Sequence, residues 1–322
     1  MIDLLPYQQS IENALTNIPF SSQPSNLYDP LNYFLKIGGK RMRPILALMA
    51  CEMFGQKYEQ ALNAAIAVEI FHNFSLIHDD IMDKAPLRRG QETVHKKWND
   101  NIAILSGDVL LVKAYQEIEK YEAETALALL KIFNRTAVEV CEGQQYDMDF
   151  ETEQYVSVEQ YIEMIKNKTA VLLGCSLEMG SIVAGATIDD YQNIYEFGVN
   201  LGIAFQLQDD LLDVYGDQSK FGKQIAGDII ANKKTFLWLT ALKDASAEQK
   251  LELNSLLKET NPSTKIDGVI AIYNQLQIKE KTQKKMHQYY HAALENINRI
   301  SVSEAAKKPL LSLGEFLMQR DH

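Results

Sequence analysis

Hydrophobic residues recur at helical spacing along most of this chain. Apolar positions three and four residues apart run through residues 61–80, 123–140, 191–215 and 284–300. Alternating apolar and polar runs bounded by turn residues, the pattern of half-buried strands, are hard to find. Eight prolines and sixteen glycines in 322 residues leave room for long helices. The pattern therefore predicts an all-α fold.

Two of these segments, residues 61–78 and 196–212, are apolar on nearly every face. Such helices are typical of the centre of a bundle or the wall of an internal cavity. From about residue 244 onward, charged and amide side chains lie on amphipathic segments, which is the pattern of an outer layer. The sequence has no Ser/Gly-rich linker, low-complexity tract or tandem repeat. We therefore expect one domain over residues 1–322, a single large helical bundle around a central apolar cavity.

Composition and charge exclude several classes of protein. The formal net charge of −11 argues against a general nucleic-acid surface. Cys51, Cys141 and Cys175 are far apart and odd in number, which indicates neither a disulfide framework nor a zinc motif and fits a reducing compartment. The first residues lack a signal-peptide pattern, and no apolar run approaches the ~18 residues of a membrane span. We expect a cytoplasmic protein with no nucleic-acid partner and no integral membrane segment.

One spacing, Asp-Asp-x-x-Asp, occurs twice. DDIMD (79–83) and DDLLD (209–213) each close one of the two all-apolar segments. Positions four apart lie on one helix face, so Asp79 and Asp83 form a carboxylate pair whose like charges repel unless a cation binds. Mg2+ is such a cation, because it takes oxygen ligands from one or two carboxylates and from substrate phosphates. One motif alone is more typical of a solvated helix end, but two motifs at matching positions favour metal binding, with carboxylates facing each other across a cavity.

Short basic motifs marked by Gly or Pro are candidate partners for a phosphate-bearing ligand. They are GGKRMRP (38–44), RRG (88–90), NKT (167–169), FGKQ (221–224) and ANKKT (231–235). Each by itself is more typical of a solvated surface cluster. Together, in a chain of net negative charge, they favour diphosphate binding, since arginine forks and lysine ammonium groups bind phosphate. The sequence contains neither a P-loop nor a dinucleotide-binding glycine motif.

Helical spacing adds two polar candidates. His72 lies two turns before Asp79 on about the same face, and Gln206 lies three residues before Asp209. Both could therefore line the site. His78, in the same apolar segment as His72, is expected to be a core residue with a satisfied ring.

In their order along the chain, these motifs resemble the trans-isoprenyl diphosphate synthases, the polyprenyl synthetase family that includes farnesyl and geranylgeranyl diphosphate synthases. The resemblance extends from about residue 33 to 320 and rests on GGKRMRP, HNFSLIHDDIMD, LRRG, GQQYD (143–147), KT, FQLQDDLLDVYGD, FGK and GD…KKT. It implies a homodimer that condenses isopentenyl diphosphate head-to-tail with dimethylallyl, geranyl or farnesyl diphosphate, using about three Mg2+ ions per active site.

The implied reaction fits the chemistry of these residues. The allylic diphosphate leaves as an anion, which metal ions and cationic side chains stabilise. The remaining carbocation needs a dry pocket in which the double bond of isopentenyl diphosphate attacks it. The departing diphosphate is the expected proton acceptor, so no side-chain base is assigned.

The resemblance also implies roles for individual residues. It assigns magnesium to Asp79, Asp83 and Asp209, with Asp80, Asp210 and Asp213 as supporting carboxylates. It assigns the allylic diphosphate to Arg88, Lys168, Thr169, Gln206, Lys223 and Lys233, and gives Lys168 and Lys233 a role in the catalytic step as well. It assigns isopentenyl diphosphate to Gly39, Lys40, Arg43, His72 and Arg89. One departure, Asn232 where the family often has glycine, leaves the backbone path before Lys233 open.

Family logic places a floor for the growing product one turn or more before DDIMD. Phe74 lies five residues before Asp79 and would cap the tunnel, while the small Ser75 leaves part of its width open. Phe71, one turn deeper, is a second candidate floor. Both phenylalanines could instead be plain core residues. We expect geranylgeranyl diphosphate as the product, and farnesyl diphosphate next.

Other classes of protein predict different motifs. A class I terpene cyclase would share the bundle and one aspartate motif, but it usually has an Asn/Ser/Glu metal motif in place of DDLLD and needs no isopentenyl site. A head-to-head synthase would carry DxxxD motifs. A non-catalytic partner subunit of a prenyl synthase would have lost aspartates or arginines, and this chain keeps the core set. We therefore favour a short-chain prenyl diphosphate synthase, with the cyclase and the partner subunit as alternatives.

Overall fold

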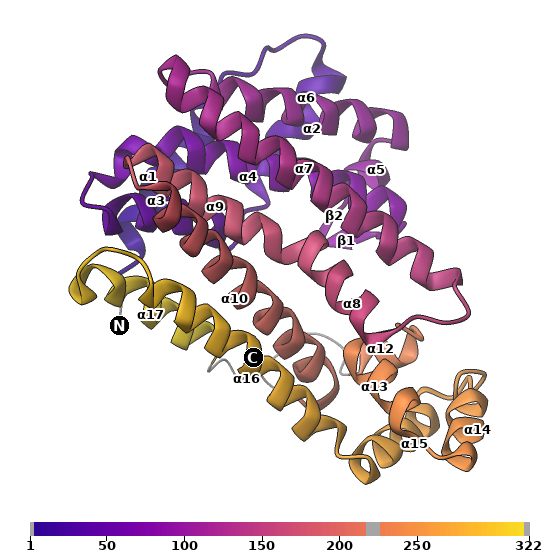
Figure 1. Cartoon of the computed structure of the whole chain (residues 1–322). Coiled ribbons are helices and arrows are strands. Elements are labelled where there is room, and N and C mark those ends of the chain that lie inside the picture. Colours follow the sequence, from indigo (N-terminus) through magenta and orange to yellow (C-terminus); the bar gives the residue numbers. More distant parts are fainter. Residues whose placement is uncertain (1–2, 217–225, 319–322) are drawn as a thin grey trace. The chain divides into compact units, whose positions relative to one another are not determined.

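The structure is a computed structural model that describes residues 3–216 and 226–318. These residues form helices almost throughout, so the all-α prediction is confirmed (Figure 1). The exception among them is a short antiparallel hairpin of β1 (Leu87–Arg88) and β2 (Gln91–Glu92). Contacts divide the chain into two compact units, and the prediction of one domain around a central apolar cavity stays a prediction.

Unit 1 comprises residues 1–136, 172–195 and 299–310. Besides the hairpin, it contains α1 (Leu5–Thr16), α2 (Ser25–Lys36), α3 (Met42–Met53), η1 (Tyr58–Ala61), α4 (Leu62–Met82), α5 (Val94–Lys97), α6 (Asp100–Ile118) and parts of α7 (Ala123–Thr152), α9 (Val171–Val183), α10 (Ile188–Tyr215) and α17 (Glu304–Met318).

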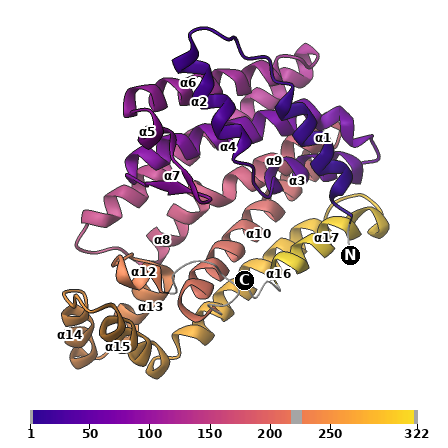
Figure 2. The ribbon, with the colours of Figure 1, turned by 180° about the vertical axis from the view of Figure 1, so that it is seen from behind.

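The central helix of unit 1 is α4. It packs along α6, and α1 and α3 contact its other sides (Figure 2). Because neighbours surround it, α4 buries residues on every face, among them Ile66, Val68 and Phe71. Gly180 of α9 permits a close crossing with α3, since a Cβ there would lie 2.0 Å from the Ala47 carbonyl oxygen. The predicted all-round apolar helix at 61–78 is confirmed.

Unit 2 comprises residues 137–171, 196–298 and 311–322. It contains the remaining parts of α7, α9, α10 and α17, together with α8 (Val158–Ile165), η2 (Lys166–Ala170), α12 (Gly227–Ile230), α13 (Phe236–Asp244), α14 (Ala247–Leu256), α15 (Pro262–Gln275) and α16 (Ile278–Asn298).

Local signals start several helices of unit 2. Ser157 and Ser246 form capping boxes at the starts of α8 and α14, where each hydroxyl accepts a backbone N–H and a glutamine side chain returns the bond. Beyond these, α13 packs on α8 and α16, and α15 contacts α12, α14 and α16. Within the described residues, no helix combines the length and apolar character needed to cross a membrane.

Candidate active site

The first aspartate motif lies at the end of α4, in unit 1. Asp80 is buried, with 1% of its surface exposed, and its Oδ1 accepts a hydrogen bond from Arg88 Nε at 2.8 Å. Arg88 Nη2 also donates to Asp79 Oδ2 at 3.3 Å, whereas Asp83 is exposed. Burial raises the pKa of Asp80, and the Arg88 guanidinium opposes that rise. One arginine therefore holds the first two aspartates of the motif.

A tight hairpin turn separates the two arginines of RRG. Arg89 and Gly90 both have positive φ, 52° and 75°, between the paired residues Arg88 and Gln91. Two central residues of positive φ are typical of the type I′ turn that matches strand twist. Arg88 consequently contacts the aspartates, while Arg89 reaches Gly39, where a Cβ would lie 2.6 Å from its Nη1. A side chain larger than hydrogen at position 39 would displace this guanidinium.

A cationic cluster forms around Arg43, also in unit 1. Arg43 Nη1 donates to His72 Nε2 at 3.2 Å, and its buried Nε has no hydrogen-bond partner in the described residues. Burial and the neighbouring arginines, Arg43 first, lower the pKa of His72 well below its usual value, so the ring is neutral. Burial also lowers the pKa of Arg43 to about 10, which leaves the guanidinium charged at neutral pH. The buried Nε of a charged Arg43, which has no described hydrogen-bond partner, is suited to bind an anion.

Arg41 of the same GGKRMRP motif has a different environment. Its side chain is buried in ion pairs with Glu12 and Glu69, at 2.7 and 2.6 Å. The sequence places Lys40, Arg41 and Arg43 in one basic cluster, but the structure separates them, with Lys40 exposed and Arg41 inside. Sequence reasoning missed the role of Glu69, for which an isolated glutamate in an all-apolar helix is the signal.

The second aspartate motif lies at the end of α10, in unit 2. Asp210 is buried, with 4% of its surface exposed, and its Oδ2 accepts from the Tyr161 hydroxyl at 2.5 Å. Gln206 Nε2 donates to the other oxygen at 3.3 Å. Burial raises the pKa of Asp210 to about 7, which the hydrogen bond from Tyr161 partly offsets. Tyr161 was not among the predicted site residues.

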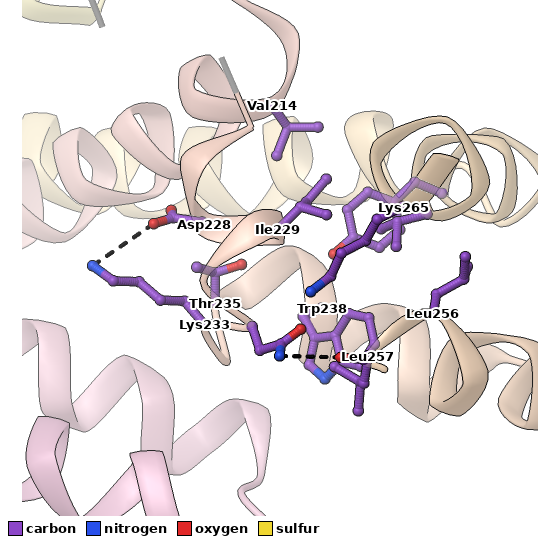
Figure 3. A pocket seen from close by; sticks show the side chains of 12 residues that line it. Val214, Asp228, Ile229, Lys233, Thr235, Trp238, Leu256, Leu257 and Lys265 are labelled. Carbon is purple, nitrogen blue, oxygen red and sulfur yellow. Dashed lines mark hydrogen bonds and ion pairs between the residues drawn. The ribbon is translucent and has the colours of Figure 1, made fainter. Parts of the chain in front are cut away.

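The third aspartate of this motif organises the start of α12. Asp213 Oδ2 accepts from the backbone N–H of Asp228 at 3.0 Å, and its carbonyl accepts from Ala226 at 2.7 Å. Figure 3 shows Lys233 extended toward Asp228, with Nζ and Oδ1 3.7 Å apart. Lys233 is two-thirds exposed, so this contact leaves it able to meet a ligand.

Asn232 resolves the open question about the loop before Lys233. It has φ of 56°, the left-handed region that favours glycine, and asparagine tolerates this region better than other non-glycine residues. Its side chain donates to the Leu257 carbonyl at 3.3 Å. The substitution for glycine therefore keeps the backbone turn.

Lys168 and Thr169 lie in the π-helical turn η2. Such turns inside helices are rare and frequently lie at functional sites. Gly143 of α7 permits the close approach of this turn, because a Cβ there would lie 2.2 Å from the Lys168 nitrogen. Asp147, also in GQQYD, accepts from Lys168 Nζ at 2.5 Å. The GQQYD motif thus packs and orients the predicted substrate lysine.

Aromatic side chains gather one to two turns before DDIMD. The ring centroid of Phe71 lies 5.5 Å from that of Phe74 and 5.2 Å from that of Phe133. Phe74 also contacts His78 edge-on at 4.7 Å. His78 Nε2 lies 3.1 Å from the Ile104 carbonyl, so the ring has a partner as expected, although the side chain is 20% exposed and only partly buried.

The structure therefore brings the predicted residues together in several groups, each within one of the two units. Unit 1 brings together Arg88 with Asp79 and Asp80, and separately Gly39, Arg43, His72 and Arg89. Unit 2 brings together Gln206 with Asp210, Lys233 with Asp228, and Lys168 with Asp147. Lys223 lies outside the described residues.

The carboxylates fit magnesium bound jointly with a substrate. Within the described part of the chain, no three Asp, Glu, His or Cys side chains converge to hold an ion by themselves. Mg2+ commonly uses one or two carboxylates together with substrate phosphates, and Asp79 and Asp83 offer such a pair at the accessible end of α4.

Comparison with known proteins identifies the family. Residues 24–276 match the polyprenyl synthetase family. A geranylgeranyl diphosphate synthase from Saccharolobus solfataricus is 40% identical over 88% of this chain and 87% of its own. The chain belongs to the polyprenyl synthetase family, as the resemblance predicts.

Solved structures agree in fold. A crystal structure of a geranylgeranyl pyrophosphate synthase is 45% identical, with a TM-score of 0.94 over 99% of both chains. A geranylgeranyl pyrophosphate synthase from Corynebacterium glutamicum, solved with isoprenyl diphosphate and magnesium, is 25% identical, with a TM-score of 0.85 over 99% of this chain and 100% of that chain.

Proposed function

We propose that this protein is a short-chain trans-prenyl diphosphate synthase that condenses isopentenyl diphosphate head-to-tail with allylic diphosphates. One observation carries the proposal: α4 and its neighbours in unit 1 form two chemically distinct sites. One pairs carboxylates with Arg88, and the other is the Arg43–His72–Arg89 cluster. Two sites suit two diphosphate substrates, whereas a cyclase needs only one. The relatives named geranylgeranyl synthases support the same activity.

We propose that Asp79, Asp83 and Asp209 hold magnesium, which the Corynebacterium relative binds together with isoprenyl diphosphate. When bound, the metal supplies positive charge that stabilises the departing diphosphate. About three ions per active site is the proposed number. Asp80, Asp210 and Asp213 do not need to reach the metal, because each already accepts hydrogen bonds that orient the end of its helix or the loop beyond it.

The cationic residues bind the two diphosphates. Arg88, Lys168 and Lys233 hold the allylic diphosphate and stabilise its charge as the bond to carbon breaks. Thr169, Gln206 and Lys223 complete this set. Asp147 holds Lys168 at 2.5 Å, so the ammonium group needs little reorganisation when substrate binds.

Isopentenyl diphosphate binds to the second set, formed by Gly39, Lys40, Arg43, His72 and Arg89. The buried, unpartnered Nε of Arg43 and the neutral ring of His72 favour an anion over a cation at this place. The double bond of isopentenyl diphosphate attacks the allylic carbocation, and the departed diphosphate takes the proton released from the product.

The aromatic cluster supports the proposed chain-length floor. Phe74 contacts Phe71 and His78, and Phe71 contacts Phe133, so these rings brace each other. The Ser75 hydroxyl donates to the His72 carbonyl at 2.8 Å, one helical turn back, so it is held by its own helix. We propose geranylgeranyl diphosphate as the product, with farnesyl diphosphate next.

A homodimer is the proposed assembly. Leu105 and Val112 of α6 lie seven residues apart on one face and are 58% and 56% exposed, and Leu127 of α7 is 56% exposed. Exposed apolar side chains in such number on neighbouring helices are typical of an interface. Light scattering should give the mass of two chains, and Leu105→Lys with Val112→Lys should give one.

The activity is tested by incubating the protein with Mg2+, isopentenyl diphosphate and each of dimethylallyl, geranyl and farnesyl diphosphate, followed by chromatography of the dephosphorylated products. We expect farnesyl diphosphate to be extended by one unit. Extension of geranyl but not farnesyl diphosphate would place the floor higher. No isopentenyl consumption with any primer would contradict the proposal and favour a cyclase or a partner subunit.

A further inference from the structure

Arg41 of the GGKRMRP motif is engaged in hydrogen bonds within the protein and is not available to bind substrate. Its side chain is buried, with 4% of the residue exposed. Nε donates to Glu12 Oε1 at 2.7 Å, Nη1 to Glu69 Oε1 at 2.6 Å and Nη2 to the Leu35 carbonyl at 3.1 Å. Each guanidinium nitrogen therefore already has a protein acceptor, and a diphosphate oxygen would have to displace one.

The two carboxylates that Arg41 contacts differ in burial. Glu69 lies in the middle of α4, its side chain is 5% exposed, and it also accepts from Asn73 Nδ2 at 3.1 Å. Glu12 of α1 is 48% exposed. A buried carboxylate loses far more than an exposed one when its charged partner is removed. The Arg41–Glu69 pair is consequently the strong half of this network.

The pair joins the GGKRMRP loop to α4 beside the cationic cluster. Glu69 precedes His72 by three residues on the helix, and Arg41 precedes Arg43 by two, so the pairs 41–69 and 43–72 join the same two segments. Arg41 also has φ of 50° and lies immediately before α3. This strained residue is therefore held in place by its side chain, and its position sets where Gly39 and Arg43 lie.

Charge supports the same conclusion. Arg89 lies within repulsive range of both Arg41 and Arg43 in a partly buried cluster, and the Glu69 carboxylate attracts all three. Replacing this carboxylate by an amide of the same shape would remove the negative charge that the three arginines share and leave Arg41 with the half-exposed Glu12.

We propose that Arg41 and Glu69 are positioning residues for isopentenyl diphosphate: they hold Gly39 and Arg43 against Arg89 and His72 without touching the substrate. This inference rests on the proposed function. It predicts that the pair governs the affinity for isopentenyl diphosphate and leaves the allylic diphosphate, which binds other residues, unaffected.

The test uses the variants Glu69→Gln and Arg41→Lys. For each variant, kcat is measured together with two separate KM values, one for isopentenyl diphosphate and one for farnesyl diphosphate. We expect KM for isopentenyl diphosphate to rise about tenfold or more, and KM for farnesyl diphosphate to stay within about twofold. Glu12→Gln should raise KM for isopentenyl diphosphate by less than about threefold, because its carboxylate is half exposed.

Glu178→Gln is the matched control. Glu178 is a buried carboxylate, 3% exposed, that pairs with Arg135 at 2.9 Å in the same unit. Its replacement should lower the Tm as Glu69→Gln does, without changing KM for isopentenyl diphosphate. If Glu69→Gln does not fold, the double variant Arg41→Met with Glu69→Met removes both charges, should fold, and should keep the raised KM.

The outcomes separate this inference from the proposed function. A wild-type protein that does not consume isopentenyl diphosphate contradicts the function itself. An active wild type whose folded Glu69 variants keep the normal KM for isopentenyl diphosphate overturns only the inference. Equal rises of both KM values, or the same change in Glu178→Gln, would show a general structural role and overturn it too.

Discussion

Asp80 and Asp210 occupy the same second position in their motifs, and both are buried, but their partners differ in charge. Asp80 of unit 1 accepts from the Arg88 guanidinium at 2.8 Å, whereas Asp210 of unit 2 accepts from the neutral Tyr161 hydroxyl at 2.5 Å. A guanidinium compensates a buried carboxylate directly, and a phenol only by its dipole. The two motifs have the same spacing, but the buried aspartate of unit 1 is compensated by a charged side chain and that of unit 2 by a neutral one.

The ion pairs beside the two motifs also differ. Arg88 also donates to Asp79 at 3.3 Å, so this carboxylate meets a cation before any metal binds. In unit 2 the described ion pair of the neighbouring loop is between Asp228 and Lys233. We therefore expect equal losses of activity when a proposed metal ligand of either motif is removed, but unequal losses of stability when the partner of Asp80 or of Asp210 is removed.

The largest expected effect is the loss of a proposed metal ligand. Asp79→Ala and Asp209→Ala should each lower kcat by about 10³-fold, because the charge on the departing diphosphate is then poorly stabilised. Steady-state assays at several Mg2+ concentrations measure this. Asp189→Ala, an exposed aspartate elsewhere on α10, is the control and should change little. A large loss of kcat in only one of the two variants would show that the two motifs do not contribute equally to catalysis.

The second-largest expected effect is the loss of Arg88, the charged partner of Asp80. Arg88→Met leaves the Asp80 carboxylate buried without its counter-charge and should lower the free energy of unfolding by about 2–4 kcal/mol, as well as weakening allylic substrate binding. Urea unfolding measures the stability. Adding Asp80→Leu should restore stability but not activity. Unchanged stability in Arg88→Met would show that the ion pair is not a structural anchor.

A smaller effect is expected from the loss of the Tyr161 hydroxyl, the neutral partner of Asp210. Tyr161→Phe removes one hydrogen bond from a buried carboxylate and should lower the free energy of unfolding by about 1–2 kcal/mol, less than Arg88→Met. The activity should fall less than about tenfold, since Tyr161 touches no proposed metal ligand. Tyr289→Phe, a half-buried tyrosine of α16 in the same unit, serves as the control. A greater loss than for Arg88→Met would reverse the comparison.

The smallest effect is at the loop of unit 2. Asn232→Gly should change the Tm by less than a degree or two, because glycine accepts the φ of 56° freely. Asn232→Ala should cost about 1 kcal/mol, because alanine does not adopt this region without strain. Thermal unfolding of the pair measures the difference, and equal Tm values in the two variants would exclude a conformational role for position 232.

The sequence by itself determined the features that depend on local repetition. Helical periodicity predicted the all-α fold, the all-round apolar pattern indicated that α4 would be either a central helix or a cavity wall, and the spacing of Asp79 and Asp83 placed them on one helix face. These follow from 3.6 residues per turn and the burial of apolar surface, which are properties of adjacent residues. The ordered motifs were sufficient to predict the family.

Only the tertiary structure decided which charged residues are partners. In Arg-Met-Arg the sequence cannot show that Arg41 turns inward to Glu69 while Arg43 remains beside His72. Nor can it show that Tyr161 supports Asp210 across 49 positions of chain, or that Asp147 holds Lys168. Hydrogen bonds and ion pairs depend on distances of a few tenths of an ångström between segments remote in sequence, and those distances are set by packing rather than by any local pattern.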